Sequence, residues 1–414
     1  MAQTTVVLSD GSSSEESLPR LPRIGRSFDD SLVDLHSLAN SVFLAERYAT
    51  GRKAISRVEI PLRNGLSSDL ANSLEGLFIR LFGYSPVFAA GEHTGPLFEM
   101  ESDVQWTDHH TCLFSCGMDS YSGILSASEL FPVVGAFTLH SDFHTLTSRA
   151  QILGKVALSP AGIELRTIGA PPHSSMTRMT RGVLYVLNAV LLGNKRIIVP
   201  EIGPTMFQPP FTLLDEISIT TRPHILQSAK KIAEAVTGQS ITVIKPNEDL
   251  TKAEVAVASP KPEFLKETYS CRSTSFADSN APHCGSCYGC IVRRLAVDVA
   301  GVSDRRYRKG GLTGEGADNT AHLVRFSADF LSDSDSLPQY VTEIIENHGK
   351  QDLFRRFALD NLSGFIRLSE KSTPSVLQRK LMDIVLKAAD RDELLERIEA
   401  VRDNKRKPNF ENKL

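Results

Sequence analysis

Apolar residues recur with two different periods between residues 29 and 106, and each period predicts one kind of element. Residues 58–62 form a short apolar run that is typical of a strand. Further along, apolar positions recur three or four residues apart, which predicts a helix capped by Ser67. These positions are Leu70, Leu74, Leu77, Phe78 and Leu81. We therefore expect a small α/β domain over residues 29–106.

From residue 107 to about residue 258, short apolar strands alternate with helices. The predicted strands are 110–114, 133–139, 164–168, 196–199 and 241–244. The predicted helices are 120–130, 181–192 and 223–237. This alternation favours a parallel sheet covered by helices, which makes the fold class α/β. We expect this sheet to form the core of a domain over residues 107–310.

The two ends of the chain differ from this core. Residues 1–28 are rich in serine, glutamate and proline, so we expect a flexible leader that buries too little apolar surface to order. Residues 311–414 are predicted to form a helical C-terminal region, because apolar positions again recur at helical spacing. They include Leu377, Leu381, Ile384, Val385, Leu394, Leu395, Ile398 and Val401. The basic run 405–408 is predicted to be a frayed, solvated tail.

Composition narrows the classes of partner. The 414 residues carry 46 Lys and Arg against 49 Asp and Glu, so the bulk charge indicates neither a nucleic-acid surface nor a membrane surface. No apolar run approaches the roughly 18 residues of a membrane span, and no N-terminal signal segment is visible. Four of the six cysteines lie in one cluster, which favours metal or thiol chemistry over disulfides. We expect a cytoplasmic protein.

The cysteine cluster has the spacing of a metal site. Cys284, Cys287 and Cys290 place three thiols within seven residues, and Cys271 lies upstream. Glycines between the three thiols allow the backbone to turn from one ligand to the next. Four thiolates suit tetrahedral zinc, with a sulfur to metal distance of about 2.3 Å. Residues 271–290 therefore predict a structural zinc site.

A second motif, residues 115–120, follows the first predicted strand of the central sheet and opens a helix. Backbone N–H groups and the helix dipole converge on an anion at such a position. Gly117 permits a tight turn, Ser115 and Ser120 offer hydroxyl groups to phosphate oxygens, and Asp119 can hold Mg²⁺. The loop lacks the lysine of a Walker motif. It predicts a phosphate site, with an ordinary capped turn as the structural alternative.

This loop resembles the Ser-Gly-Gly-x-Asp-Ser loop of the PP-loop ATP pyrophosphatases, which cleave ATP between the α and β phosphates. Together with the motif Cys-Gly-x-Cys-x-x-Cys-x-x-Arg at 284–293, residues 108–300 resemble the 7-cyano-7-deazaguanine synthase (QueC) family. The resemblance implies a PP-loop sheet of the adenine nucleotide alpha hydrolase-like type with a zinc knuckle. It implies ATP, Mg²⁺ and Zn²⁺ as cofactors. It also implies that the nucleotide is bound by Ser115, Cys116, Gly117, Met118, Asp119 and Ser120.

The resemblance also implies individual roles. Ser115, Asp119 and Ser120 are implied to take part in catalysis. His144 follows the second strand and Arg181 precedes an apolar helix, at positions where the family binds the nucleotide. Lys252 lies in a Thr-Lys-Ala-Glu segment that resembles the family's own, which implies a catalytic role. For His144 the residues alone leave a site role and a structural role equally open, and for Lys252 the alternative is an exposed lysine at the helix start.

The sequence also departs from the family pattern. Residues 200–222 replace the run that helps the family form its substrate pocket. The resemblance therefore supports the activating chemistry better than it supports the identity of the acceptor. The spacer between Cys271 and Cys284 holds twelve residues, longer than expected for the biosynthetic enzyme. His283 beside the cluster leaves the fourth ligand slightly open. Cys116 replaces the family's first glycine, so we expect a backbone angle there that suits a residue with a side chain.

Other polar residues have two interpretations each. Cys116 is expected to be a small loop residue, with a nucleophilic thiolate at the helix N-terminus as the alternative. Cys112 alternates within an apolar strand and is expected in the core. One of Arg293 and Arg294 is expected to meet phosphate or a substrate carboxylate, with a surface ion pair as the alternative.

The resemblance implies an enzyme, an ATP-dependent ligase that forms AMP and pyrophosphate. Its implied substrate is 7-carboxy-7-deazaguanine or a relative, and the amine acceptor is ammonia or a protein amine. The added flanking domains resemble those of QueC-like proteins of antiphage operons, which makes a protein acceptor or operon partner a further expectation. Three alternatives stay open: queuosine-precursor synthesis, a PP-loop tRNA-modifying enzyme, and a non-catalytic zinc-stabilised scaffold. The tRNA enzyme would need a persulfide-carrying cysteine pair and a basic groove.

Overall fold

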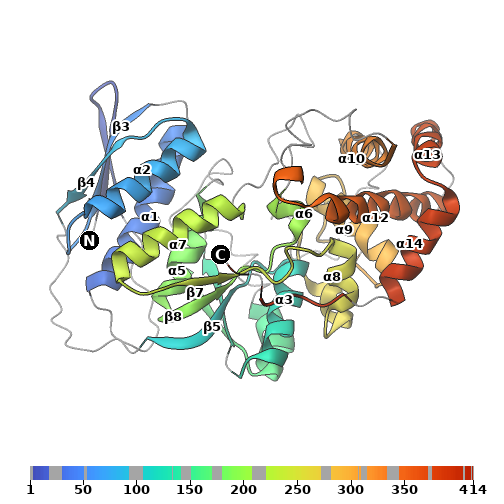
Figure 1. The fold of residues 1–414 in the computed structure, drawn as a ribbon, viewed down its shortest axis with the longest axis horizontal. Coiled ribbons are helices and arrows are strands. Elements are labelled where there is room, and N and C mark those ends of the chain that lie inside the picture. The colour runs from blue at the N-terminus through green and yellow to red at the C-terminus, as the bar shows by residue number, and fades with distance from the viewer. Residues whose placement is uncertain are drawn as a thin grey trace.

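The computed structural model describes most of the chain. The described residues are 3–17, 30–50, 54–92, 106–132, 134–140, 151–169, 180–207, 221–271, 281–305, 307–308, 315–332, 345–371, 375–403, 406–411 and 413. Figure 1 shows three parts in a row: an N-terminal sheet with its helices, a central sheet, and a group of C-terminal helices. The predicted domain boundaries stay predictions.

The N-terminal sheet has four strands in the order β2-β1-β3-β4. They are β1 (Gln3–Leu8), β2 (Ser13–Ser17), β3 (Ile55–Pro61) and β4 (Val87–Gly91). β1 is antiparallel to β2 and β3, and β4 is parallel to β3. The expectation of a flexible leader is therefore wrong for residues 3–17. Thr4, Val6 and Leu8 alternate with more exposed residues and are buried, so this short stretch has an apolar face despite its polar surroundings.

Two helices connect this sheet to the rest of the molecule. They are α1 (Asp30–Thr50) and α2 (Ser68–Phe82). Ser67 caps α2 as predicted, because its side chain accepts a hydrogen bond from the N–H of Leu70. The predicted apolar set from Leu70 to Leu81 is the buried face of α2. α1 packs against α5 (Arg181–Leu191) and α7 (Pro223–Thr237), and α2 packs against α7, so the N-terminal part is docked on the central part through helices.

The central sheet has five parallel strands in the order β7-β6-β5-β8-β9. They are β5 (Thr107–Leu113), β6 (Val134–His140), β7 (Glu164–Gly169), β8 (Asn194–Ile198) and β9 (Thr242–Ile244). A helix, α3 (Met118–Leu130), connects β5 to β6. All five predicted strands are present near their predicted positions, so the predicted parallel α/β sheet is confirmed.

The strand order reverses between β5 and β8. The chain leaves β5 toward β6 on one side, whereas β8 and β9 lie on the other side. In open parallel sheets, ligands bind at such a reversal, beyond the carboxyl ends of the strands. The loop 115–120 follows β5, the segment 199–202 follows β8, and helix α8 (Lys252–Ala258) comes after β9. Three segments with polar residues therefore follow three adjacent strands.

The C-terminal part is helical, as predicted. Its elements are α10 (Glu315–Ser332), α12 (Gln351–Glu370), α13 (Val376–Ala388) and α14 (Arg391–Asp403), which gather beside α9 (Tyr288–Ala300) (Figure 1). α12 and α9 approach closely, because a Cβ added to Gly364 would lie 2.6 Å from the carbonyl oxygen of Leu295. Among the helices of the described residues, none combines the length and apolar character required to cross a membrane.

The chain after α14 returns to the central sheet (Figure 1). The N–H of Asn409 donates to the carbonyl oxygen of Pro246 over 2.7 Å. Phe410 is buried, with its ring edge-on to Phe131 at a centroid distance of 5.4 Å. Lys413 pairs with Ile244 of β9 as an antiparallel bridge. Arg406 and Lys407 are exposed, as predicted for a solvated charge run, but the residues that follow them are not frayed, because Phe410 is buried in the core.

Candidate functional site

The loop 115–120 joins β5 to the N-terminus of α3. Ser115 is exposed, and its hydroxyl donates to Ser120 Oγ over 3.2 Å, while Ser120 Oγ donates to the carbonyl oxygen of Gly117 over 3.0 Å. Gly117 is the residue before the helix, and no side chain caps the helix N–H groups. An uncapped helix N-terminus with hydroxyl groups beside it is suited to bind an anion.

Cys116 has an unusual backbone conformation. Its φ is +62°, and it is the one residue other than glycine with a positive φ in the part of the chain that the structure describes. A left-handed conformation costs an L-residue about 1–2 kcal/mol. The expectation of an angle that suits a side chain is therefore wrong, because the loop keeps the backbone that a glycine would adopt. The Cys116 side chain is buried, which favours the small loop residue over an exposed nucleophile.

Asp119, in the first turn of α3, forms a buried ion pair with Lys252, the first residue of α8. Lys252 Nζ lies 2.9 Å from Asp119 Oδ1 and 2.6 Å from Oδ2. Both residues are at most 9% exposed. Two residues far apart in the sequence and predicted to act together are thus in direct contact. The alternative of an exposed lysine at the helix start is wrong.

Glu201, which the sequence analysis did not single out, joins this pair from the segment after β8. The residue is half-buried, and its carboxyl group lies beside that of Asp119. Burial, followed by the negative charge of Asp119, raises the pKa of Glu201 to about 8, although Lys252 acts in the opposite direction. A pKa of about 8 keeps Glu201 mostly protonated at neutral pH. One feature of the sequence indicated Glu201, its position shortly after a predicted strand.

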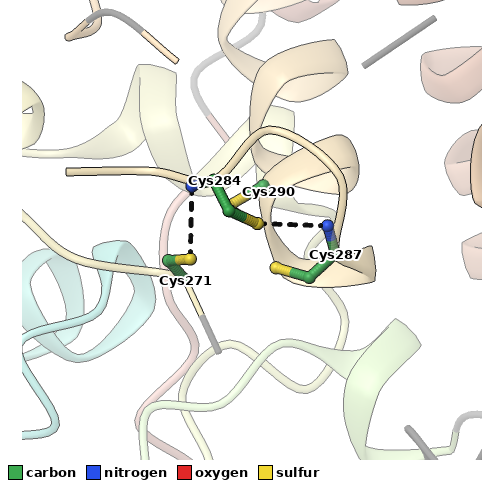
Figure 2. Close-up of side chains that lie close together, drawn as sticks. All are labelled: Cys271, Cys284, Cys287 and Cys290. Atoms are coloured by element: carbon green, nitrogen blue, oxygen red, sulfur yellow. Dashed lines mark hydrogen bonds between the residues drawn. The ribbon is translucent and has the colours of Figure 1, made fainter. Parts of the chain in front are cut away.

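The four cysteines gather as predicted. Figure 2 shows their thiols converging. Cys284 and Cys287 lie in the turn that leads into α9, Cys290 lies in the first turn of α9, and Cys271 comes from a separate segment. All four sulfur atoms lie within 4.8 Å of one another. Zinc with sulfur ligands at about 2.3 Å requires sulfur atoms about 3.8 Å apart. The Sγ atoms of Cys284 and Cys290 are 3.8 Å apart, so the donor set fits zinc.

The backbone around the cluster is arranged to stabilise thiolates. The N–H groups of Ser286 and Cys287 both donate to Cys284 Sγ, over 3.4 and 3.3 Å (Figure 2 shows the second bond). His283 is not part of the cluster, because it stacks on Tyr269 and its Nε2 lies 3.4 Å from the N–H of Ser270. The fourth residue of the cluster that could hold a metal is therefore Cys271 rather than His283.

One short segment connects the cysteine cluster to the loop 115–120. The N–H of Tyr269 donates to the carbonyl oxygen of Cys116 over 2.7 Å, two residues before Cys271. Ser270 packs so closely on the cluster turn that a Cβ on Gly289 would lie 2.5 Å from its carbonyl oxygen. The cysteine cluster therefore supports the strained loop directly.

Arg293 holds this same segment in place. Its guanidinium is fully buried and donates to Asp304, Thr268, Ser270 and the carbonyl oxygen of Leu265 over 2.7 to 3.2 Å. Neither predicted alternative for Arg293, a phosphate ligand or a surface ion pair, is correct. Arg294 lies over the ring of Tyr307, 5.3 Å from its centroid.

The other two predicted nucleotide-binding residues are His144 and Arg181. His144 lies outside the described residues. Arg181 begins α5, with its guanidinium carbon 5.9 Å from the ring centroid of Tyr185 on the same helix. Their implied roles stay predictions. Cys112 is fully buried in the core, as predicted.

The site thus combines a parallel α/β sheet, charged residues at the reversal of its strand order, and a cluster of four cysteines. The family model of the queuosine biosynthesis protein QueC matches residues 220–301, about a fifth of the chain. This match contains Lys252, Arg293 and the four cysteines, and it supports a QueC-like, ATP-using enzyme. It does not reach the loop 115–120. A search of curated proteins gave no match.

Proposed function

We propose that this chain uses ATP to activate a carboxylate and then transfers the acyl group to an amine. The observation that carries the proposal is the contact between Asp119 and Lys252 beside the uncapped N-terminus of α3, at the reversal of a parallel sheet. In the first step, a carboxylate oxygen bonds to the α-phosphorus and pyrophosphate leaves. In the second step, the amine nitrogen bonds to the carbonyl carbon, AMP leaves and the nitrogen loses a proton.

The residues present fit this chemistry. Ser115, Ser120 and the N–H groups of α3 are placed to bind phosphate oxygens, and Lys252 supplies a buried positive charge. Asp119 and Glu201 offer carboxylate oxygens, which Mg²⁺ prefers. Mg²⁺ would offset polyphosphate charge when bound. Activation is required because a free carboxylate would have to expel oxide, whereas an acyl-adenylate expels AMP.

For the carboxylate we propose 7-carboxy-7-deazaguanine or a relative. The support is the QueC match over residues 220–301 and the loop motif at 115–120. For zinc we propose a structural role, since four thiolates would close the coordination shell and leave no open position for a reactant.

For the acceptor we propose a protein amine in addition to ammonia, as part of antiphage defence in the cytoplasm. The support is that the N-terminal sheet and the C-terminal helices both lie outside the family match. They provide surface that can position a macromolecular amine, and such positioning raises effective concentration by orders of magnitude.

The test is a reaction of the full chain with ATP, Mg²⁺, 7-carboxy-7-deazaguanine and either ammonium or the product of a neighbouring gene. Small molecules and intact protein masses are followed together. We expect AMP and pyrophosphate from the wild type and neither from Asp119→Ala, with both proteins folded by circular dichroism. Formation of ADP would refute the activation step. With ammonium the product would be an amide, and a second activation of the amide oxygen by ATP would give a nitrile. Efficient nitrile formation without a protein adduct would refute the protein acceptor and favour queuosine-precursor synthesis.

A further inference from the structure

Lys252 is held by a helix cap that extends into the C-terminal part. Thr251 and Glu254 form a reciprocal capping box at the start of α8, with the N–H of Thr251 donating to Glu254 Oε2 over 3.0 Å. The N–H of Glu254 donates back to Thr251 Oγ1 over 3.3 Å. Because Lys252 lies between these two residues, the capping box fixes the backbone position from which the Lys252 side chain extends.

Residues of α12 and α14 bind both halves of this capping box. Thr251 Oγ1 donates to Asp360 Oδ2 over 2.5 Å. Arg397 bridges the two acidic side chains, with Nε 2.8 Å from Asp360 Oδ1 and Nη2 2.9 Å from Glu254 Oε1. Arg356 also pairs with Glu254 and donates to the carbonyl oxygen of Asp249 over 2.9 Å. Each polar side chain of the capping box therefore has a partner from the C-terminal helices.

Stability alone does not account for this network. Glu254 and Asp360 are buried, and the two arginines balance their charges. The desolvation of buried ion pairs offsets most of their attraction, so apolar residues of similar size often stabilise a fold at least as well. What a buried network of this kind provides is one defined arrangement of its members, here the start of α8.

The same helix α12 also supports the segment that carries Glu201. The short helix α6 (Gly203–Met206) begins two residues after Glu201. A Cβ on Gly203 would lie 2.4 Å from Leu353 Cδ2 of α12 and 2.0 Å from the carbonyl oxygen of Glu248. Both segments that face Asp119 thus rest on α12.

We infer that Arg397 and Asp360 are positioning residues for Lys252, and that the C-terminal helices complete the charged site although they lie outside the family match. The catalytic part of this inference rests on the proposed function. The structural part does not, because the environment of Lys252 can be measured without turnover.

The test compares Arg397→Gln with Arg391→Gln in the full-length chain. Arg391 is a matched control, since it lies on the same helix and pairs with Glu370 of α12 over 2.9 Å, but both side chains are about half exposed. The first readout is the rate at which an amine-reactive reagent acylates Lys252, measured by peptide mass spectrometry. The second is kcat and KM for AMP formation.

We expect Lys252 to be acylated faster in Arg397→Gln than in the wild type, and kcat to fall by about 10- to 100-fold. KM for ATP should change less than kcat. Arg391→Gln should match the wild type in both readouts. Arg397→Lys keeps the charge but cannot contact both carboxylates as a guanidinium does, so it should lie between the two.

The outcomes are distinguishable. If folded Arg397→Gln shows wild-type acylation of Lys252, the inference is wrong. If the wild type forms no AMP, the proposed function fails, while the acylation rates still decide the positioning role. If Arg397→Gln does not fold, Arg397→Lys decides instead, and equal acylation of Lys252 in that variant and the wild type would overturn the inference.

Discussion

Replacing Arg293 by methionine should destabilise the protein far more than the same change at Arg294. Methionine keeps an unbranched apolar stem of similar length but removes the guanidinium. Arg293 is fully buried, and its partners include the carboxylate of Asp304 and the two hydroxyl groups of Thr268 and Ser270.

The expected magnitude follows from what the change leaves behind. Removing one member of a buried ion pair costs about 3–5 kcal/mol, because the remaining charge is desolvated without compensation. Arg294 is partly exposed and contributes mainly its contact with the Tyr307 ring, worth about 0.5–1 kcal/mol. The expected difference between the two variants is therefore several times RT.

This difference should depend on pH. Although burial opposes it, the hydrogen bond and charge of Arg293 hold the pKa of Asp304 below its usual value of 3.8. A lowered pKa contributes stability above the unfolded-state pKa, and this contribution is lost as the pH falls through the folded-state pKa. The difference in free energy of unfolding between the wild type and Arg293→Met should thus be largest near neutral pH and should shrink in acid.

The assay is urea unfolding of the wild type and both variants, with zinc release to a chromogenic chelator as a second signal. Because Arg293 holds the segment before Cys271, Arg293→Met should also release zinc more readily. Equal free energies of unfolding for Arg293→Met and Arg294→Met would refute this reasoning. Loss of AMP formation in Arg293→Met without loss of stability would instead favour a phosphate-binding role.

Two further predictions concern the cysteine cluster and the raised pKa of Glu201. Cys287→Ser should lose zinc and solubility together, since a closed thiolate site contributes folding energy directly; elemental analysis showing zinc retained in a well-folded variant would contradict this. Because the pKa of Glu201 is raised, the free energy of unfolding of the nucleotide-free wild type should fall as the pH rises from about 4.5 to about 8. In that window the folded state binds more protons than the unfolded state. Glu201→Gln, which resembles the protonated form, should not show this loss in urea unfolding at a series of pH values. If the two proteins differ in free energy of unfolding by the same amount at every pH, the raised pKa of Glu201 is contradicted.

The sequence predicted the central sheet well because its strands and helices follow clear hydrophobic periods. The cap at Ser67 and the gathering of four cysteines were predictable for a similar reason, since local spacing determines both. β1 and β2 were missed because β1 buries only Val6 and Leu8 beside the polar Thr4, and the serine and glutamate residues that follow favour disorder. Composition outweighed a short alternating pattern.

Long-range electrostatics could not be read from the sequence. The spacing of Arg293 after the cysteine motif suggested an anion ligand, but its partner Asp304 was identifiable only once α9 and the segment after it were placed. Glu201 and Arg397 were overlooked for the same reason, as their partners lie on other elements. The left-handed angle of Cys116 also depends on tertiary contacts, because its carbonyl oxygen is fixed by Tyr269.

The return of residues 409–413 to the central sheet affects how this protein avoids self-association. β9 is an edge strand, and unpaired edge strands template pairing between molecules. The bridge between Lys413 and Ile244 occupies that edge, and Phe410 covers the ring of Phe131. Cleavage after α14 would uncover a strand edge and an aromatic side chain at once, which makes this segment a guard against aggregation.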